Sequence, residues 1–178
     1  MPVKAGVRIG VQKNCPPGKG LHSQTANAVG TLLALNQLWR LGLSEKELAS
    51  EAKAIDPIMG KMMESHFRGS RKKPEEPWVV VVIPKTIRLD REWLAENASR
   101  NGRNIESVAV AHFPDLKKIM DNMDTIGWSK IRMAGMGPAL IGYSKRKIGI
   151  GKIPKNVRGK VDFLWIGKAC NGEFKLLH

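Results

Sequence analysis

The chain has 178 residues, of which 30 are Lys or Arg and 16 are Asp or Glu, so its net charge is +14. Hydrophobic residues make up 42% of it, which is enough for a folded core and excludes wholesale disorder. No apolar run approaches the ~20 residues that a membrane-spanning helix needs, and two cysteines cannot form a disulfide framework. We therefore expect a cytoplasmic α/β protein without a membrane partner, whose charge suits a nucleic acid or a phosphorylated ligand.

The first third of the chain predicts a strand, a glycine-containing loop and a long helix. Val7–Val11 alternates apolar and polar residues, as a half-buried strand does. Prolines and glycines then exclude regular structure from residue 14 to residue 20. From Ser23 to Trp39 the apolar residues recur at helical spacing, so a helix should follow the loop directly.

Local capping signals predict three further helices. Ser44 with Glu47 forms a capping-box pattern, which places a second helix from residue 45 to about residue 54. Asp90 is expected to cap a short helix. Pro114 suits the first turn of another helix, which should continue to about Thr125.

The second half of the chain predicts a sheet. The apolar run Trp78–Ile83 is typical of a strand buried on both faces, and Pro84 ends it. Strands are also expected over 128–133, 139–143 and 161–166, with a second glycine loop over 134–138. The fold class is therefore α/β (α+β), with helices packed on a mixed or antiparallel sheet.

Two glycine loops and one carboxylate carry a resemblance to a known family. The run Asn14-Cys15-Pro16-Pro17-Gly18-Lys19-Gly20-Leu21, with the helical stretch 31–39, is similar to the second motif of the GHMP kinases. These are the galactokinase, homoserine kinase, mevalonate kinase and phosphomevalonate kinase superfamily. Met133–Ala139 is similar to the third motif, and Ile55-Asp56-Pro57 resembles the stretch with the catalytic carboxylate. The most similar branch is diphosphocytidyl-methylerythritol kinase, and the resemblance covers most of residues 6–144.

The resemblance implies a GHMP-kinase-like two-layer sandwich, in which a part like domain 2 of ribosomal protein S5 precedes a ferredoxin-like part. Residues 1–66 would form the first part, with the phosphate loop, and residues 67–178 the second. The family's first motif, which bears a substrate-side Lys, is not found ahead of the second motif. We therefore expect a member shortened at the N-terminus, or a start codon set too late.

The same resemblance implies an ATP-dependent small-molecule kinase with ATP and magnesium as cofactors and a phosphorylated small molecule as substrate. Asp56 would be the catalytic base, although a helix or turn cap before Pro57 explains it equally well. Thr25 would also supply a hydroxyl to magnesium. The residues expected to hold the nucleotide are Gly18, Gly20, Leu21, Ser23, Thr25, Gly135 and Gly137.

The phosphate loop departs from the family pattern. His22 and Gln24 stand where the family has glycines, and they would crowd a triphosphate. The enzyme is then either an active kinase or a degenerate remnant of one. A relative of ribofuranosylaminobenzene phosphate synthase, with phosphoribosyl-transfer chemistry, is an alternative, and so is a non-catalytic basic binding protein.

A basic segment spans residues 145–160 and contains no acidic residue. It is the place where a nucleic acid would bind, but it lacks interleaved aromatic residues, so a solvated basic face is the favoured interpretation. Its glycines and Pro154 exclude a long helix. The basic residues are Lys145, Arg146, Lys147, Lys152, Lys155, Arg158 and Lys160.

Overall fold

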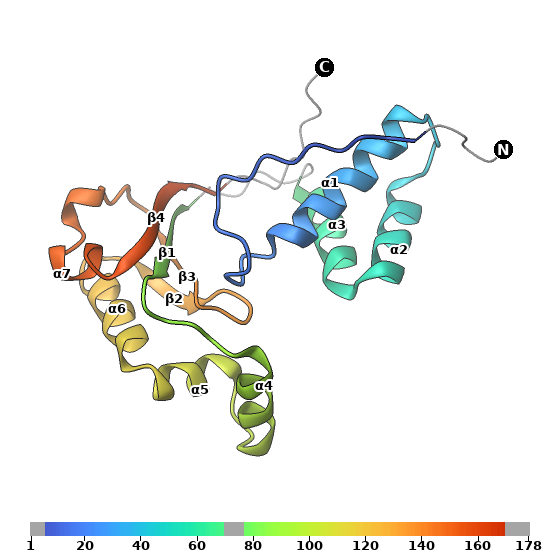
Figure 1. Cartoon of the computed structure of the whole chain (residues 1–178). Coiled ribbons are helices and arrows are strands. Elements are labelled where there is room, and N and C mark those ends of the chain that lie inside the picture. Colours follow the sequence, from blue (N-terminus) through green and yellow to red (C-terminus); the bar gives the residue numbers. More distant parts are fainter. Residues whose placement is uncertain (1–5, 70–76, 170–178) are drawn as a thin grey trace. The chain divides into compact units, whose positions relative to one another are not determined.

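A computed structural model describes residues 6–69 and 77–169, which divide into two compact units (Figure 1). The first unit contains residues 6–16 and 23–69, and the second contains Pro17–His22 and residues 77–169. The short segment Pro17–His22, which holds most of the predicted phosphate loop, therefore clusters with the second unit rather than with the helix that follows it in the chain.

Three helices form the first unit: α1 (Ser23–Leu38), α2 (Glu45–Ile55) and α3 (Pro57–Gly69). The predicted capping box is confirmed, since Glu47 N–H donates to the Ser44 hydroxyl and Ser44 N–H donates to the Glu47 carboxylate. Hydrogen bonds from the Ser44 hydroxyl and from the Ser44 N–H to the Glu47 carboxylate hold the pKa of Glu47 below its ordinary value. The core between the helices consists of Val29, Leu48, Ala52, Met59 and Met63.

The predicted strand at Val7–Val11 is wrong. Residues 6–13 have no strand or helix, and the side chains of Val7, Ile9 and Val11 are exposed. A segment with alternating apolar residues forms a strand only when its backbone N–H and C=O groups pair with those of a neighbouring strand. Among the described residues none pairs with this segment.

The second unit is built on a four-stranded antiparallel sheet with strand order β2-β3-β1-β4 (Figure 1). Its strands are β1 (Trp78–Pro84), β2 (Ser129–Met133), β3 (Leu140–Ser144) and β4 (Val161–Lys168). All four were expected from the sequence, with bounds shifted by one or two residues. The central strand β1 pairs with β3 on one side and with β4 on the other.

Helices cover one face of this sheet. They are α4 (Arg91–Arg100), α5 (Ile105–His112) and α6 (Pro114–Thr125), and the sequence predicted α4 and α6 but not α5. Val80, Val82 and Leu140 of the sheet lie in one core with Leu116 and Ile119 of α6. The expectation that β1 is buried on both faces is therefore half wrong, because Val79 and Val81, which point to the other face, are only partly buried.

The basic segment contains a single 3₁₀ turn, η1 (Ile150–Lys152), and one short helix, α7 (Lys155–Arg158). This confirms that no long helix forms there. Ile153 and Val157 anchor the segment in the core of the second unit, while its cationic side chains are exposed. No helix among residues 6–69 and 77–169 is both long and apolar enough to cross a membrane.

Candidate functional site

The two glycine loops pack directly against each other within the second unit. The backbone N–H of Ala139 donates to the carbonyl oxygen of Lys19 at 3.1 Å. A Cβ atom at Gly20 would stand 2.0 Å from the carbonyl oxygen of Ala134 and 2.8 Å from the nitrogen of Gly137, so only glycine fits there. The backbones of Gly20 and Gly137 therefore lie directly against each other.

Positive backbone angles shape the first loop. Gly18, Gly20 and His22 have φ values of 71°, 88° and 51°, while Lys19 and Leu21 between them do not have positive φ. Alternation of this kind turns successive N–H groups toward one side and makes a concave site for an anion. Among the described residues, the N–H groups of Gly20, Leu21 and His22 have no hydrogen-bond partner.

Leu21 anchors this loop through its side chain. It packs against Ile83, Ala134 and Ala139, which are the buried residues of a small apolar cluster at one end of the sheet. Burial of the leucine fixes the adjacent backbone without using its N–H groups. The role of Leu21 in the site is thus to hold the loop in place, while any contact with a ligand would come from its backbone.

A cation that the sequence did not indicate also holds the loop. Nη2 of Arg91 donates to the carbonyl oxygen of Gly18 at 2.9 Å. Arg91 is the first residue of α4, and the only sequence signal at this point was the cap residue Asp90 before it. Together with Lys19 it brings positive charge to a loop in which no acidic residue occurs.

His22 lies beside the second glycine loop. A Cβ atom at Gly135, where φ is 53°, would stand 2.9 Å from Nε2 of His22 and 2.9 Å from the carbonyl oxygen of Gly20. The imidazole therefore occupies the space next to Gly135. That His22 would crowd a triphosphate stays a prediction.

The remaining predicted site residues belong to the first unit. Ser23 and Thr25 are half-buried in the first turn of α1, which begins directly after His22 in the chain. Asp56 lies between α2 and α3, and its Oδ1 accepts hydrogen bonds from the N–H groups of Ile58 at 2.6 Å and Met59 at 3.2 Å. Oδ1 thus caps α3, and Oδ2 has no hydrogen bond within the described part of the chain.

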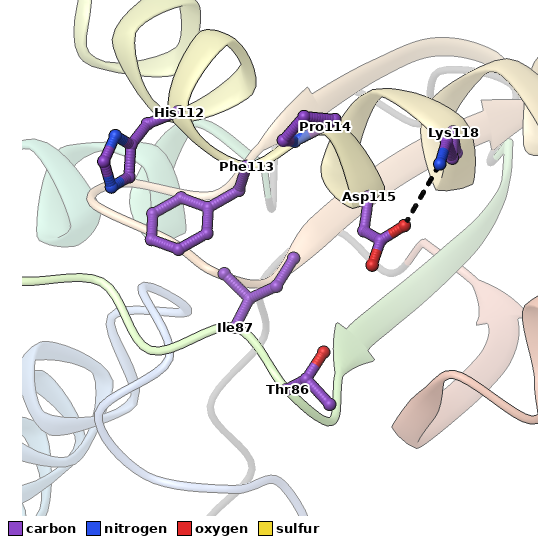
Figure 2. Close-up of a pocket in the computed structure, with 7 residues that line it drawn as sticks. All are labelled: Thr86, Ile87, His112, Phe113, Pro114, Asp115 and Lys118. Carbon is purple, nitrogen blue, oxygen red and sulfur yellow. Dashed lines mark ion pairs between the residues drawn. The ribbon is translucent and has the colours of Figure 1, made fainter.

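A separate concavity of about 340 Å³ opens in the second unit (Figure 2). Thr86, Ile87, His112 and Phe113 line it, and at its side Lys118 pairs with Asp115 at 3.8 Å. None of the predicted site residues lines this concavity. Elsewhere in residues 6–69 and 77–169, no group of three His, Cys, Asp or Glu side chains is arranged to hold a metal ion.

Comparison with known proteins identifies similar sequences and a similar fold. Residues 2–67 match the family described as GHMP kinases N terminal domain. The 4-diphosphocytidyl-2-C-methyl-D-erythritol kinase of Limosilactobacillus reuteri is 27% identical over 192 aligned residues, which cover 88% of this chain and 67% of the relative. The kinase of the same name from Syntrophomonas wolfei is 29% identical over 174 aligned residues, 78% of this chain and 61% of the relative.

The fold is also that of a solved structure. A crystal structure of 4-(cytidine 5'-diphospho)-2C-methyl-D-erythritol kinase matches with a TM-score of 0.60 at 20% identity, over 88% of this chain and 68% of that one. The chain thus spans about two thirds of the length of these relatives. These matches confirm the resemblance to GHMP kinases and the predicted fold class.

Proposed function

We propose that this chain is a member of the GHMP kinase superfamily and an ATP-dependent kinase of a small phosphorylated alcohol, with 4-diphosphocytidyl-2-C-methyl-D-erythritol as the first substrate to test. The substrate is the one acted on by the kinases to which this chain is 27–29% identical. The proposed reaction chemistry rests on residues of the two glycine loops, of α1 and of the start of α3.

The observation that carries the proposal is the contact between the two glycine loops. Their close approach at Gly20 leaves unpaired N–H groups at Gly20, Leu21 and His22, and Arg91 and Lys19 add positive charge. Backbone N–H groups in such a concave loop bind phosphate because they present fixed partial positive charges without a side chain in the way. This donor set fits the phosphates of a nucleotide.

The proton in this reaction would pass to Asp56. Because Oδ1 is held by two N–H groups of α3, the carboxylate has a fixed orientation, and Oδ2 is left to accept the proton of a substrate hydroxyl. Bound ATP supplies the phosphoryl group, and Mg²⁺ neutralises charge on its phosphates. Thr25 offers one hydroxyl to that ion, which in proteins keeps several waters and few protein ligands.

The test is a coupled assay of ADP release with ATP, Mg²⁺ and 4-diphosphocytidyl-2-C-methyl-D-erythritol, followed by ³¹P NMR of the product. We expect ADP release to depend on the diphosphocytidyl substrate and the product to carry one additional phosphate monoester. Absence of both signals at saturating substrate would refute the proposal. Release of pyrophosphate from phosphoribosyl diphosphate would instead support the phosphoribosyl-transfer alternative.

A further inference from the structure

The segment that leads into α4 touches both glycine loops of the second unit. Nη2 of Arg91 donates to the carbonyl oxygen of Gly18 in the first loop at 2.9 Å. Two residues earlier, Cδ1 of Leu89 lies 2.6 Å from the position that a Cβ atom at Gly137 of the second loop would take. Arg91 is therefore held beside the loops by its own hydrogen bond and by the apolar contact of Leu89.

The backbone that carries Arg91 is fixed from both directions along the chain. Oδ1 of Asp90 accepts hydrogen bonds from the N–H groups of Glu92 at 3.0 Å and Trp93 at 3.1 Å, which caps the first turn of α4. Further along the helix, Leu94 and Ala98 are buried in the core of the second unit. Because this backbone is already in place, a ligand of Arg91 would have little of the chain to order when it binds.

The positive charge of Arg91 is not neutralised by any carboxylate in the part of the chain that the structure describes. Its side chain is exposed, and it takes part in no ion pair there. The carboxylate of Asp90, its neighbour in the chain, is engaged by the N–H groups of α4. The contact with Gly18 uses one of the five N–H donors of the guanidinium, so the others are available to a ligand.

We propose that Arg91 is a direct phosphate ligand of the nucleotide site. Its Nη2 would keep the carbonyl oxygen of Gly18, while its remaining N–H groups donate to a phosphate of the ligand that the N–H groups of residues 20–22 bind. A guanidinium suits this task because its planar fork presents donors to two acceptors at once, and its hydrogen bonds to phosphate are charge-assisted. The inference rests on the proposed nucleotide site, and it makes Arg91 a ligand as well as a support of the loop.

This arrangement favours a chain of phosphates over a single phosphate ion. The contact of Arg91 lies at Gly18, near the start of the first loop, whereas the unpaired N–H groups belong to Gly20, Leu21 and His22. The loop thus has two points of attachment, and a polyphosphate can use both of them. Orthophosphate has a single phosphorus centre, so it gains less from the second point.

The test is binding of inorganic tripolyphosphate and of orthophosphate to the full chain, measured by NMR titration. We expect tripolyphosphate to shift the amide resonances of residues 20–22 and the Nε–H resonance of Arg91. Arg91→Gln should raise the Kd for tripolyphosphate about ten- to one-hundred-fold, which is the loss expected for hydrogen bonds to a charged group. The Kd for orthophosphate should rise much less.

Two further variants separate the contact from a general effect of charge. Arg91→Lys keeps the charge but has one nitrogen, so its Kd for tripolyphosphate should lie between those of the wild type and Arg91→Gln. A wild-type Kd in Arg91→Lys would mean that charge alone suffices, and it would overturn the bridging contact. Arg103→Gln removes an exposed arginine beyond the end of α4 and should bind as the wild type does. The urea midpoint of Arg91→Gln should stay close to that of the wild type, because the side chain is exposed.

The outcomes distinguish this inference from the proposed function. Equal tripolyphosphate affinity of the wild type and Arg91→Gln would overturn the inference alone. An equal rise of both Kd values in Arg91→Gln would also overturn it, because Arg91 would then only shape the loop. No resonance shift with either ion at millimolar concentration would overturn the nucleotide site together with it. Binding of tripolyphosphate without ADP release in the kinase assay would refute the proposed function and leave Arg91 as a phosphate ligand.

Discussion

The N–H of Ala139 donates to the carbonyl oxygen of Lys19 across 3.1 Å, and this hydrogen bond joins the two glycine loops of the chain. The donor is the residue that follows the second loop, and the acceptor lies in the middle of the first loop. The absence of side chains at Gly20 and Gly137 allows the two backbones to approach so closely. The proposed phosphate site therefore depends on backbone geometry more than on any side chain.

Gly20→Ala should destabilise the second unit more than Gly18→Ala does. Both glycines have positive φ, which costs alanine about 1–2 kcal/mol. Only at Gly20 would the new Cβ atom also meet backbone, at 2.0 Å from the oxygen of Ala134, whereas nothing lies within 4 Å at Gly18. We expect the overpacking to add about 1–3 kcal/mol to the loss of unfolding free energy, measured in urea. Equal losses in the two variants would contradict this contact.

Asp56→Asn should abolish phosphoryl transfer while leaving the fold intact. Asparagine caps a helix about as well as aspartate, so the unfolding free energy should change by less than about 0.5 kcal/mol. A missing proton acceptor should lower kcat by about 10²- to 10⁴-fold. Asp90→Asn is the matched control, because Asp90 caps α4 with the same pair of N–H contacts. Full activity of the Asp56 variant would leave this residue with its capping role alone.

The Kd of the wild-type chain for ATP should lie above the micromolar range. The substitution His22→Gly should lower this Kd. His22 has a φ of 51°, which glycine adopts without strain, and its imidazole lies beside Gly135. Its removal should tighten ATP about tenfold, or about 1.4 kcal/mol, in calorimetry. His112→Ala, on α5, should leave the affinity unchanged. A micromolar affinity of the wild type would show that the imidazole does not obstruct the loop.

Stability should depend on pH through Asp115. A hydrogen bond and the charge of Lys160, with a smaller contribution from Lys118, hold the pKa of Asp115 below its ordinary value. Since the pKa is lowered in the folded state, the carboxylate stabilises the fold above the ordinary value of about 3.9, and this contribution is lost as the pH falls through the lowered pKa.

Lys160→Gln removes the main cause of this lowered pKa, so the pKa of Asp115 should rise in an NMR titration. The unfolding free energy of the variant should also fall less steeply below about pH 4 than that of the wild type. Lys117→Gln, whose partner is Asp121, is the control for removing one exposed lysine of α6. An unchanged pKa of Asp115 would exclude the contact with Lys160 in solution.

Several elements could be predicted from the sequence because their causes are local. The capping box of Ser44 with Glu47, the cap at Asp90 and the proline at residue 114 mark helix starts within a few residues of chain. The glycines of the two loops were likewise evident, since few other residues adopt the φ values of Gly20 and Gly137. The similarity to GHMP kinases follows from these same short motifs.

Other features of the fold and of the candidate site depend on contacts between residues that are distant in the chain. Val7–Val11 has the pattern of a strand, but no described strand pairs with it. Arg91 meets Gly18 only because α4 starts beside the loop. Tyr143 and Trp165 share a face because β1 pairs with β3 and β4 in one particular register, and a shift of one residue would turn either ring toward the helices. Sequence patterns describe each element by itself, whereas a site needs the pairing that tertiary structure adds.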